Sequence, residues 1–157
     1  MRSAVSALEL KVPPPAMALL TGGLMWFASS PAASSEFSLP GRTYLASAIA
    51  LTGFALASLA LFSFRRAATT VNPTRPGATS ALVVSGVYRF TRNPMYLALL
   101  LVLLGWGVFL SNALAFVFLP AFVLYINRFQ IAPEELALAQ RFGPDFATYK
   151  ASVRRWI

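Results

Sequence analysis

The chain has 157 residues, of which 57% are hydrophobic and 11% charged, against roughly 25% charged in typical globular domains, and this predicts one membrane-embedded domain over residues 1–157. The net charge of +8 does not indicate nucleic-acid binding, because the arginines flank apolar stretches and form no polar face with interleaved aromatic residues. The chain has no cysteine and no histidine, which excludes disulfides, a thiol nucleophile and the commonest general base and metal ligand, so we expect no metal site.

The first apolar stretch follows Lys11 and predicts a helix over residues 14–30. Three successive prolines from Pro13 open it, and proline suits the first turn of a helix. The stretch is short for a membrane-crossing helix, which needs about 20 apolar residues. A cleaved signal peptide is the rival interpretation, since Arg2 and Lys11 precede an apolar run, but the prolines and Glu9 are misplaced for one.

The second and third apolar stretches are longer. Residues 44–64 are uncharged, rich in Ala, Leu and Phe, and predict a full membrane-crossing helix. The third stretch, residues 93–127, would form a helix about 52 Å long, which exceeds the bilayer core and must therefore turn. Ser111-Asn112 is its polar break, so we expect a helical hairpin with arms 94–110 and 113–127.

The basic residues predict how these helices are oriented. With four crossings, twelve of the 13 Lys and Arg residues fall on one side of the membrane and only Arg42 on the other. The positive-inside rule then places both termini in the cytoplasm. The prediction is an all-α polytopic protein of the inner cell membrane with about four transmembrane helices, the last two forming a hairpin.

After Arg128 the chain becomes polar and amphipathic. Pro133 can start a helix, and Glu134 and Glu135 would lie in its first turn, where carboxylates favour the positive end of the helix dipole. Gly143-Pro144 should interrupt this helix. Apolar residues recur along the tail at helical spacing and form one stripe: Phe142, Phe146, Tyr149, Val153 and Trp156. We expect an amphipathic cytoplasmic helical tail that lies on the inner membrane surface or caps the helix bundle.

The informative polar residues lie in two cytoplasmic segments, 85–96 and 127–150. Because the hairpin returns the chain to the same interface, the two segments can meet in space. Together they resemble the isoprenylcysteine carboxyl methyltransferases, with their bacterial relatives and the phospholipid methyltransferases. In that family a Gly-x-Tyr step and Arg-His-Pro-x-Tyr enter a helix, and a hairpin, an Arg, a Glu-Glu pair, Phe-Gly and a Tyr-containing tail follow. Here the pattern reads Gly86-Val87-Tyr88, Arg92-Asn93-Pro94-Met95-Tyr96, Arg128, Glu134-Glu135, Phe142-Gly143 and Tyr149.

The resemblance covers about residues 70–157 and implies a membrane-embedded site for S-adenosyl-L-methionine. The cofactor-pocket residues that it implies are Tyr88, Arg92, Asn93, Pro94, Tyr96, Glu134 and Glu135. It also implies that Arg92 and Arg128 reach the substrate or the cofactor carboxylate, and that Glu135 takes part in catalysis. Asn93 departs from the family's histidine and cannot carry a proton. No Gly-x-Gly-x-x-Gly motif follows a strand, so a Rossmann-type site is not expected.

The sequence leaves several candidates for the substrate group that would accept the methyl group. A carboxylate substrate is already nucleophilic and needs no base, whereas an amine or a thiol would need one, for which Glu134, Glu135 and Tyr96 are the candidates. We expect a lipophilic small molecule or a lipid-linked group that enters sideways from the membrane lipids. Two other functions compete: a reductase using NADPH, similar to the sterol reductases, and a non-enzymatic membrane scaffold or accessory subunit.

Each candidate residue also has a plain structural interpretation. The glutamates could simply start a helix, and adjacent residues do not share a helix face, so only one of them would point inward. Asn93 could be an ordinary helix cap, with Pro94 at the first helical position. Tyr96 and Tyr149 fit an interfacial aromatic belt, and basic residues near the helix ends fit topology anchors. The residues assigned to that anchoring role are Arg65, Arg66, Arg154 and Arg155.

Overall fold

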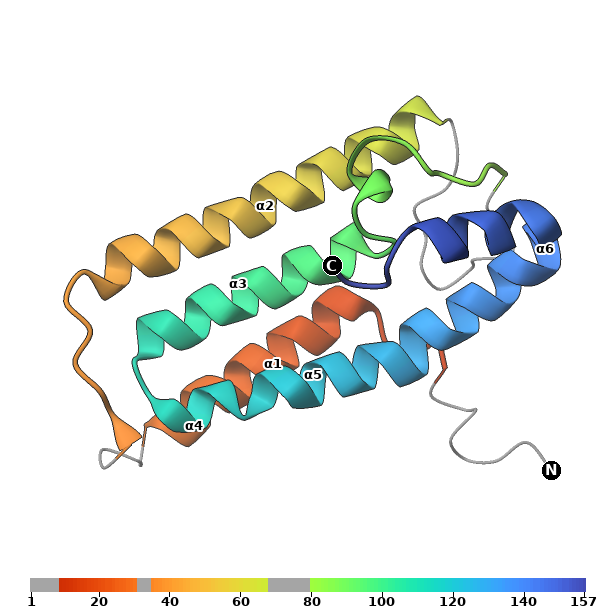
Figure 1. Ribbon diagram of the computed structural model, residues 1–157. Coiled ribbons are helices and arrows are strands. Elements are labelled where there is room, and N and C mark those ends of the chain that lie inside the picture. Colours follow the sequence, from red (N-terminus) through yellow and green to blue (C-terminus); the bar gives the residue numbers. More distant parts are fainter. Residues whose placement is uncertain (1–8, 31–34, 68–79) are drawn as a thin grey trace, which may run out of the picture.

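The computed structural model describes residues 9–30, 35–67 and 80–157, and these residues are mostly helical (Figure 1). The expected all-α class is confirmed, since the described part holds no strand and one isolated β-bridge, between Glu36 and Asn112. Arg2 and Arg75, which the expected charge count includes, lie outside the described residues. In chain order the elements are α1 (Pro14–Ser29), α2 (Arg42–Arg66), the 3-10 helix η4 (Gly86–Arg89), α3 (Pro94–Leu110), α4 (Ala113–Phe116), α5 (Phe118–Ile126), the π-helix η5 (Asn127–Ile131) and α6 (Ala132–Ser152).

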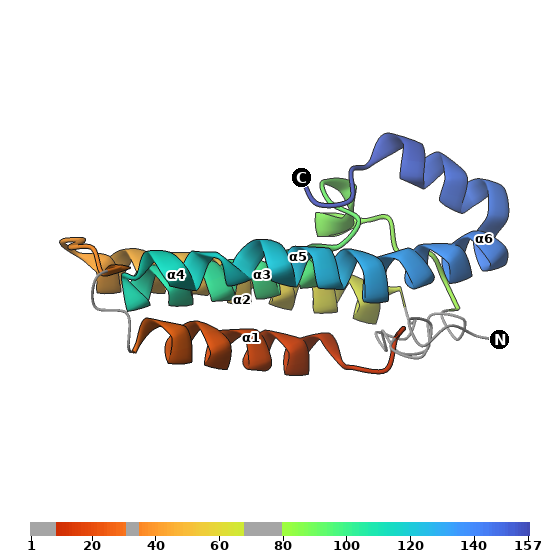
Figure 2. The same ribbon diagram turned by 90° about the horizontal axis from the view of Figure 1, so that it is seen from below.

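Four helical rods lie side by side along one axis: α1, α2, α3 and the pair α4–α5 (Figures 1 and 2). Successive rods run in opposite directions, so α2 and α5 end where α1 and α3 begin. Beyond this end α6 continues from α5 and then folds back over the bundle (Figure 2). We call it the α6 end. It brings together the two polar segments that sequence analysis singled out.

The contact between α2 and α3 depends on glycine. A Cβ atom on Gly53 would lie 2.8 Å from the carbonyl oxygen of Ala98, and one on Gly105 would lie 2.8 Å from that of Ala46. Both distances are too short for any side chain, so the two backbones touch at these positions. This close packing is the most extensive helix–helix contact in the described part of the chain.

The helical hairpin turns at Ser111-Asn112, as the sequence predicts. Ser111 adopts a left-handed conformation with φ of 50°, and the Asn112 side chain accepts a hydrogen bond from the Leu114 amide at 3.0 Å to start the second arm. That arm is not one continuous α-helix, because it is interrupted at Val117 between α4 and α5. Pro120 has no amide hydrogen to donate backward to this turn, which explains the interruption.

The tail differs from the expectation of a separate helix begun by Pro133, because α6 continues directly from α5 through η5. Pro133 cannot donate to the carbonyl oxygen of Phe129, four residues earlier. The backbone amide of Leu10 donates to that oxygen instead, at 3.0 Å. The bend comes at Gly143, where φ is 48°, and residues after it return over the bundle. The tail therefore caps the bundle.

The helices are suited to a membrane. Two stretches are long and apolar enough to cross one: Arg42–Arg66, with a mean hydropathy of 2.1 over an 18-residue window, and Ala113–Ser152, which runs from α4 to α6, with 1.6; Pro94–Leu110 is a shorter apolar helix. Large apolar side chains such as Leu19, with 79% of its surface exposed, and Phe62, with 57%, cover the outside of the bundle, as expected of a lipid-facing surface. Because α6 carries acidic and basic side chains, it lies beyond the apolar part of the helical stretch that it ends. The number of crossings and the orientation stay predictions.

Candidate active site

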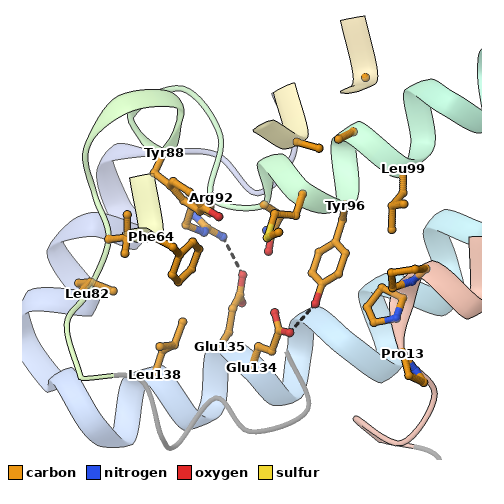
Figure 3. Close-up of a pocket in the computed structure, with 18 of the residues that line it drawn as sticks. Pro13, Phe64, Leu82, Tyr88, Arg92, Tyr96, Leu99, Glu134, Glu135 and Leu138 are labelled. Atoms are coloured by element: carbon orange, nitrogen blue, oxygen red, sulfur yellow. Dashed lines mark hydrogen bonds and ion pairs between the residues drawn. The ribbon is translucent and has the colours of Figure 1, made fainter. Parts of the chain in front are cut away.

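A cavity of about 720 Å³ lies at the α6 end (Figure 3). Its polar part is formed by the start of α3, the residues just before it and the first turn of α6. Its apolar part continues between α2 and α3 past Ala57 and Leu99 to Val102. The three prolines from Pro13 form a further part of the wall. One cavity thus joins charged groups at the bundle end to an apolar arm that runs along the helices.

Most of the cofactor residues implied by the resemblance lie on this cavity. Pro94 does not line it, being fully buried at the first position of α3. Asn93 occupies the N-cap position of α3, but its side chain forms no capping hydrogen bond, and its side-chain amide donates to the carbonyl oxygen of Arg155 at 2.9 Å. The implied residues that line the cavity are Tyr88, Arg92, Asn93, Tyr96, Glu134 and Glu135.

Glu135 is surrounded by cations. Its Oε1 accepts from Arg92 Nη2 at 3.0 Å and from Arg155 Nε at 3.1 Å, and its Oε2 accepts from Arg155 Nη2 at 2.8 Å. Lys150 Nζ lies 3.3 Å from Oε2. Burial raises the pKa of the Glu135 carboxyl, but the hydrogen bonds from Arg155 and Arg92 outweigh it, so the pKa lies below its ordinary value. Glu135 is therefore ionised at neutral pH.

Glu134 has a different environment, although it is the next residue. It accepts a hydrogen bond from the Tyr96 hydroxyl (Figure 3), and no described Lys or Arg forms an ion pair with it. Burial raises the pKa of the Glu134 carboxyl to about 7, with the Tyr96 hydrogen bond acting against this and the charge of Glu135 adding to it. Both glutamates thus point into the cavity, whereas sequence reasoning expected only one to do so.

Arg92 is held by the tail. Its Nη1 donates to the carbonyl oxygens of Lys150, at 2.9 Å, and of Val153, and its Nη2 donates to Glu135. Its Nε is buried and has no hydrogen-bond partner among the described residues. The two terminal nitrogens of Arg92, which would otherwise bind a ligand carboxylate, therefore already donate hydrogen bonds within the protein. Its Nε is the donor that has no partner among the described residues.

The two tyrosines assigned to an interfacial belt are cavity residues as well. Tyr96 packs in the main core and lines the cavity. The Tyr149 hydroxyl donates to the carbonyl oxygen of Tyr88 at 2.7 Å and so ties α6 to η4. Burial raises the pKa of Tyr149 to about 12, against a lowering effect of Arg92. Tyr149 therefore stays protonated at neutral pH and keeps donating this hydrogen bond.

The structure does not bring Arg128 to the cavity. Its guanidinium forms an ion pair with Glu9 at 2.8 Å and stacks over the ring of Phe129 at 5.4 Å, with 51% of the side-chain surface exposed. Arg128 therefore holds the segment before α1 against η5, and we leave it out of the candidate site.

Sequence reasoning missed Arg155, which it assigned to topology. Arg155 follows Arg154 in an ordinary basic pair, and nothing in the local pattern separates the two. Only the folded tail distinguishes them, because it directs the guanidinium of Arg155 to Glu135. Lys150 was missed for the same reason.

Comparison with known proteins agrees with this geometry. A model of the phospholipid methyltransferase family matches residues 42–145. The chain belongs to this family. It is similar to an uncharacterized protein of Haemophilus influenzae, with 51% identity over 63 residues that make up 40% of this chain and all of that relative. No solved structure matches the chain.

Membership of the phospholipid methyltransferase family confirms the resemblance drawn from the two segments. It indicates a membrane methyltransferase. The matched region includes α2, α3 and the start of α6, and with them Arg92, Tyr96 and both glutamates. Lys150 and Arg155 lie beyond it, although their side chains contact Glu135.

Proposed function

We propose that this protein is an integral membrane methyltransferase that uses S-adenosyl-L-methionine to methylate a lipophilic substrate. The observation that carries the proposal is the single cavity in which the segments 85–96 and 127–150 form a polar end and α2 and α3 form an apolar arm. A donor bound at the polar end and a lipid chain in the arm would meet inside one space.

The polar end fits the chemistry of this cofactor. The cavity of about 720 Å³ lies within the range of roughly 300–1,000 Å³ typical of small-molecule sites. The buried, unpaired Nε of Arg92 suits the oxygen of a carboxylate or a hydroxyl group. Glu134 and the ring of Tyr96 suit a positively charged sulfur. These groups would hold the cofactor, which when bound supplies an electrophilic methyl group.

The protein's own part in the reaction is alignment and exclusion of water. The ion pairs of Glu135 with Arg92 and Arg155 fix the polar wall. The hydrogen bond from the Tyr149 hydroxyl holds the Tyr88 backbone in place. The apolar arm keeps water away from the reacting end and accepts the lipophilic part of the substrate.

The surroundings of Glu134 favour an amine acceptor over a carboxylate. Among the described residues, every basic side chain that forms an ion pair with a cavity glutamate pairs with Glu135, and none pairs with Glu134, where it could hold a substrate carboxylate. With a pKa of about 7, Glu134 can take the proton of a substrate ammonium group and so expose the nitrogen lone pair; the methyl group would come from the cofactor, which would leave as a neutral thioether. We therefore propose a lipid-borne amine as the acceptor.

The test is calorimetric titration of the detergent-solubilised protein with S-adenosylmethionine, S-adenosylhomocysteine and NADPH. We expect the first two to bind and NADPH not to bind. Binding of NADPH alone would support a reductase, and binding of none of the three would favour a scaffold. Methyl transfer to lipid amines, compared with transfer to lipid carboxylates, then tests the acceptor.

A further inference from the structure

Arg155 joins the two segments that form the polar end. Its carbonyl oxygen accepts from the Asn93 side-chain amide at 2.9 Å and from the Thr91 hydroxyl at 3.3 Å, just before α3. Its guanidinium donates to Glu135 in α6. The neighbouring carbonyl of Arg154 accepts from the Arg92 amide at 2.9 Å. The chain around Arg155 therefore lies between the start of α3 and the start of α6 and bonds to both.

The contact with Glu135 has the geometry of a strong ion pair. Arg155 uses Nε and Nη2 on the two separate carboxylate oxygens, at 3.1 and 2.8 Å, which fixes the carboxylate plane. Arg92 and Lys150 each approach a single oxygen of Glu135, at 3.0 and 3.3 Å. Arg155 is thus the bidentate partner of the three.

The Glu135 carboxylate of this ion pair is largely shielded from solvent. The Glu135 side chain is 11% exposed, so its charge is poorly solvated and depends on its partners. Removing Arg155 would take two of the donors to this carboxylate and release it to rotate away from its present place on the cavity wall. Arg92, whose Nη2 shares Oε1 with Arg155, would lose its fixed partner.

We propose that Arg155 is a positioning residue of the methyl-donor site, which holds Glu135 and, through its backbone carbonyl, Asn93 in the arrangement that binds the cofactor. This rests on the proposed function. Arg155 does not line the cavity itself. It acts through two residues that do, and it does so from outside the region that the family model matches.

Arg154 provides a matched control. It is the adjacent residue, it carries the same charge, and its side chain is exposed and forms no hydrogen bond or ion pair with a described residue. Arg154→Ala therefore changes the net charge as Arg155→Ala does while leaving Glu135 untouched. A general role of the basic tail in anchoring to anionic lipid would make the two variants equivalent.

The experiment is titration of S-adenosylhomocysteine into the solubilised full-length protein and its variants, each first checked for folding by its thermal transition. We expect Arg155→Ala to weaken binding by about tenfold or more, Arg155→Lys to recover part of the loss through one remaining donor, and Arg154→Ala to match the wild type. In the Glu135→Gln background, Arg155→Ala should add little, since both changes break the same contact. If Arg155→Ala does not fold, Arg155→Gln takes its place with the same criteria.

Three results would overturn the proposal: wild-type affinity in Arg155→Ala, an equal loss in Arg154→Ala, or losses that add fully in the double variant. A wild-type protein that does not bind S-adenosylhomocysteine would reject the proposed function itself. The two failures are therefore distinguishable from the wild-type titration alone.

Discussion

Glu134 and Glu135 are neighbours in α6, yet they have opposite charge environments. Glu135 contacts three cations and its pKa lies below the ordinary value, whereas Glu134 contacts the Tyr96 hydroxyl and burial raises its pKa to about 7. Two adjacent carboxylates with separated pKa values can take different roles. The ionised one holds the polar wall together, and the other can exchange a proton at neutral pH.

This difference predicts a pH dependence. If the Glu134 carboxylate is the proton acceptor, as proposed, methyl transfer should increase as pH rises through about 7 and level off above it. Glu134→Gln should lower the rate by about 10²-fold and remove this step from the profile of kcat/KM against pH. Glu9→Gln, which changes a carboxylate remote from the cavity, should leave the profile unchanged. A Glu134→Gln variant with the wild-type profile would exclude the proposed role.

Two arginines that the resemblance treats alike should behave differently. Arg92 contacts Glu135 and two backbone carbonyls of the tail, whereas Arg128 is half-exposed and contacts Glu9. We expect Arg92→Ala and Glu135→Ala each to weaken S-adenosylhomocysteine binding by about tenfold or more, and Arg128→Ala to change it by less than about twofold. Calorimetry measures all three, and equal losses at Arg92 and Arg128 would contradict this site.

At the scale of elements, the contact between α2 and α3 positions the cavity, because these helices form the walls of its apolar arm. Gly53 and Gly105 allow the contact, and each leaves only 2.8 Å between an added Cβ and a facing carbonyl oxygen. Backbone cannot move aside as a flexible side chain can. The separation of the two walls is thus set by two glycines.

Gly105→Ala should therefore destabilise the protein by about 1–3 kcal/mol through overpacking, even though alanine favours a helix. Gly23→Ala in α1 is the matched control, because an added Cβ there meets nothing within 4 Å. We expect that control to be neutral or to stabilise by up to about 1 kcal/mol. Denaturation by SDS in micelles measures both. A neutral Gly105→Ala would show that α2 and α3 separate easily.

At the scale of the whole molecule, charge is segregated along the bundle axis. Arg42 starts α2 at the end opposite to α6, whereas the other described Lys and Arg residues lie before α1, at the end of α2, in or just after η4, or from η5 onward, all toward the α6 end. If the rods cross the membrane, this asymmetry orients them by the positive-inside rule. The cavity would then open toward the cytoplasm, where the cofactor is made.

Reporter fusions test this orientation. Fusions at residue 75, which lies outside the described residues, and at the carboxy terminus should both report cytoplasm, and a fusion between α1 and α2 should report the other side. A periplasmic signal from either of the first two would contradict the predicted topology. A cytoplasmic signal from the third would contradict the number of crossings.

The sequence by itself determined the all-α class, the first three long helices and the place of the turn. Expected helices over 14–30, 44–64 and 94–110 correspond to α1, α2 and α3, whose bounds differ by at most two residues. These features are local, since apolar length, proline, glycine and a polar pair act on the chain within a few residues. The family pattern is local too, because its motifs are short and ordered along the chain.

Only the tertiary structure decided which polar side chains meet. Arg155 and Arg154 are indistinguishable in the sequence, and the path of the tail after Gly143 directs the first to Glu135. Arg128 belongs to the family pattern, but its place on η5 directs it to Glu9. Both glutamates point into the cavity because α3 lies on one side of them and the returning tail on the other. Contacts between residues 20 to 119 positions apart depend on how helices cross, which no local pattern records.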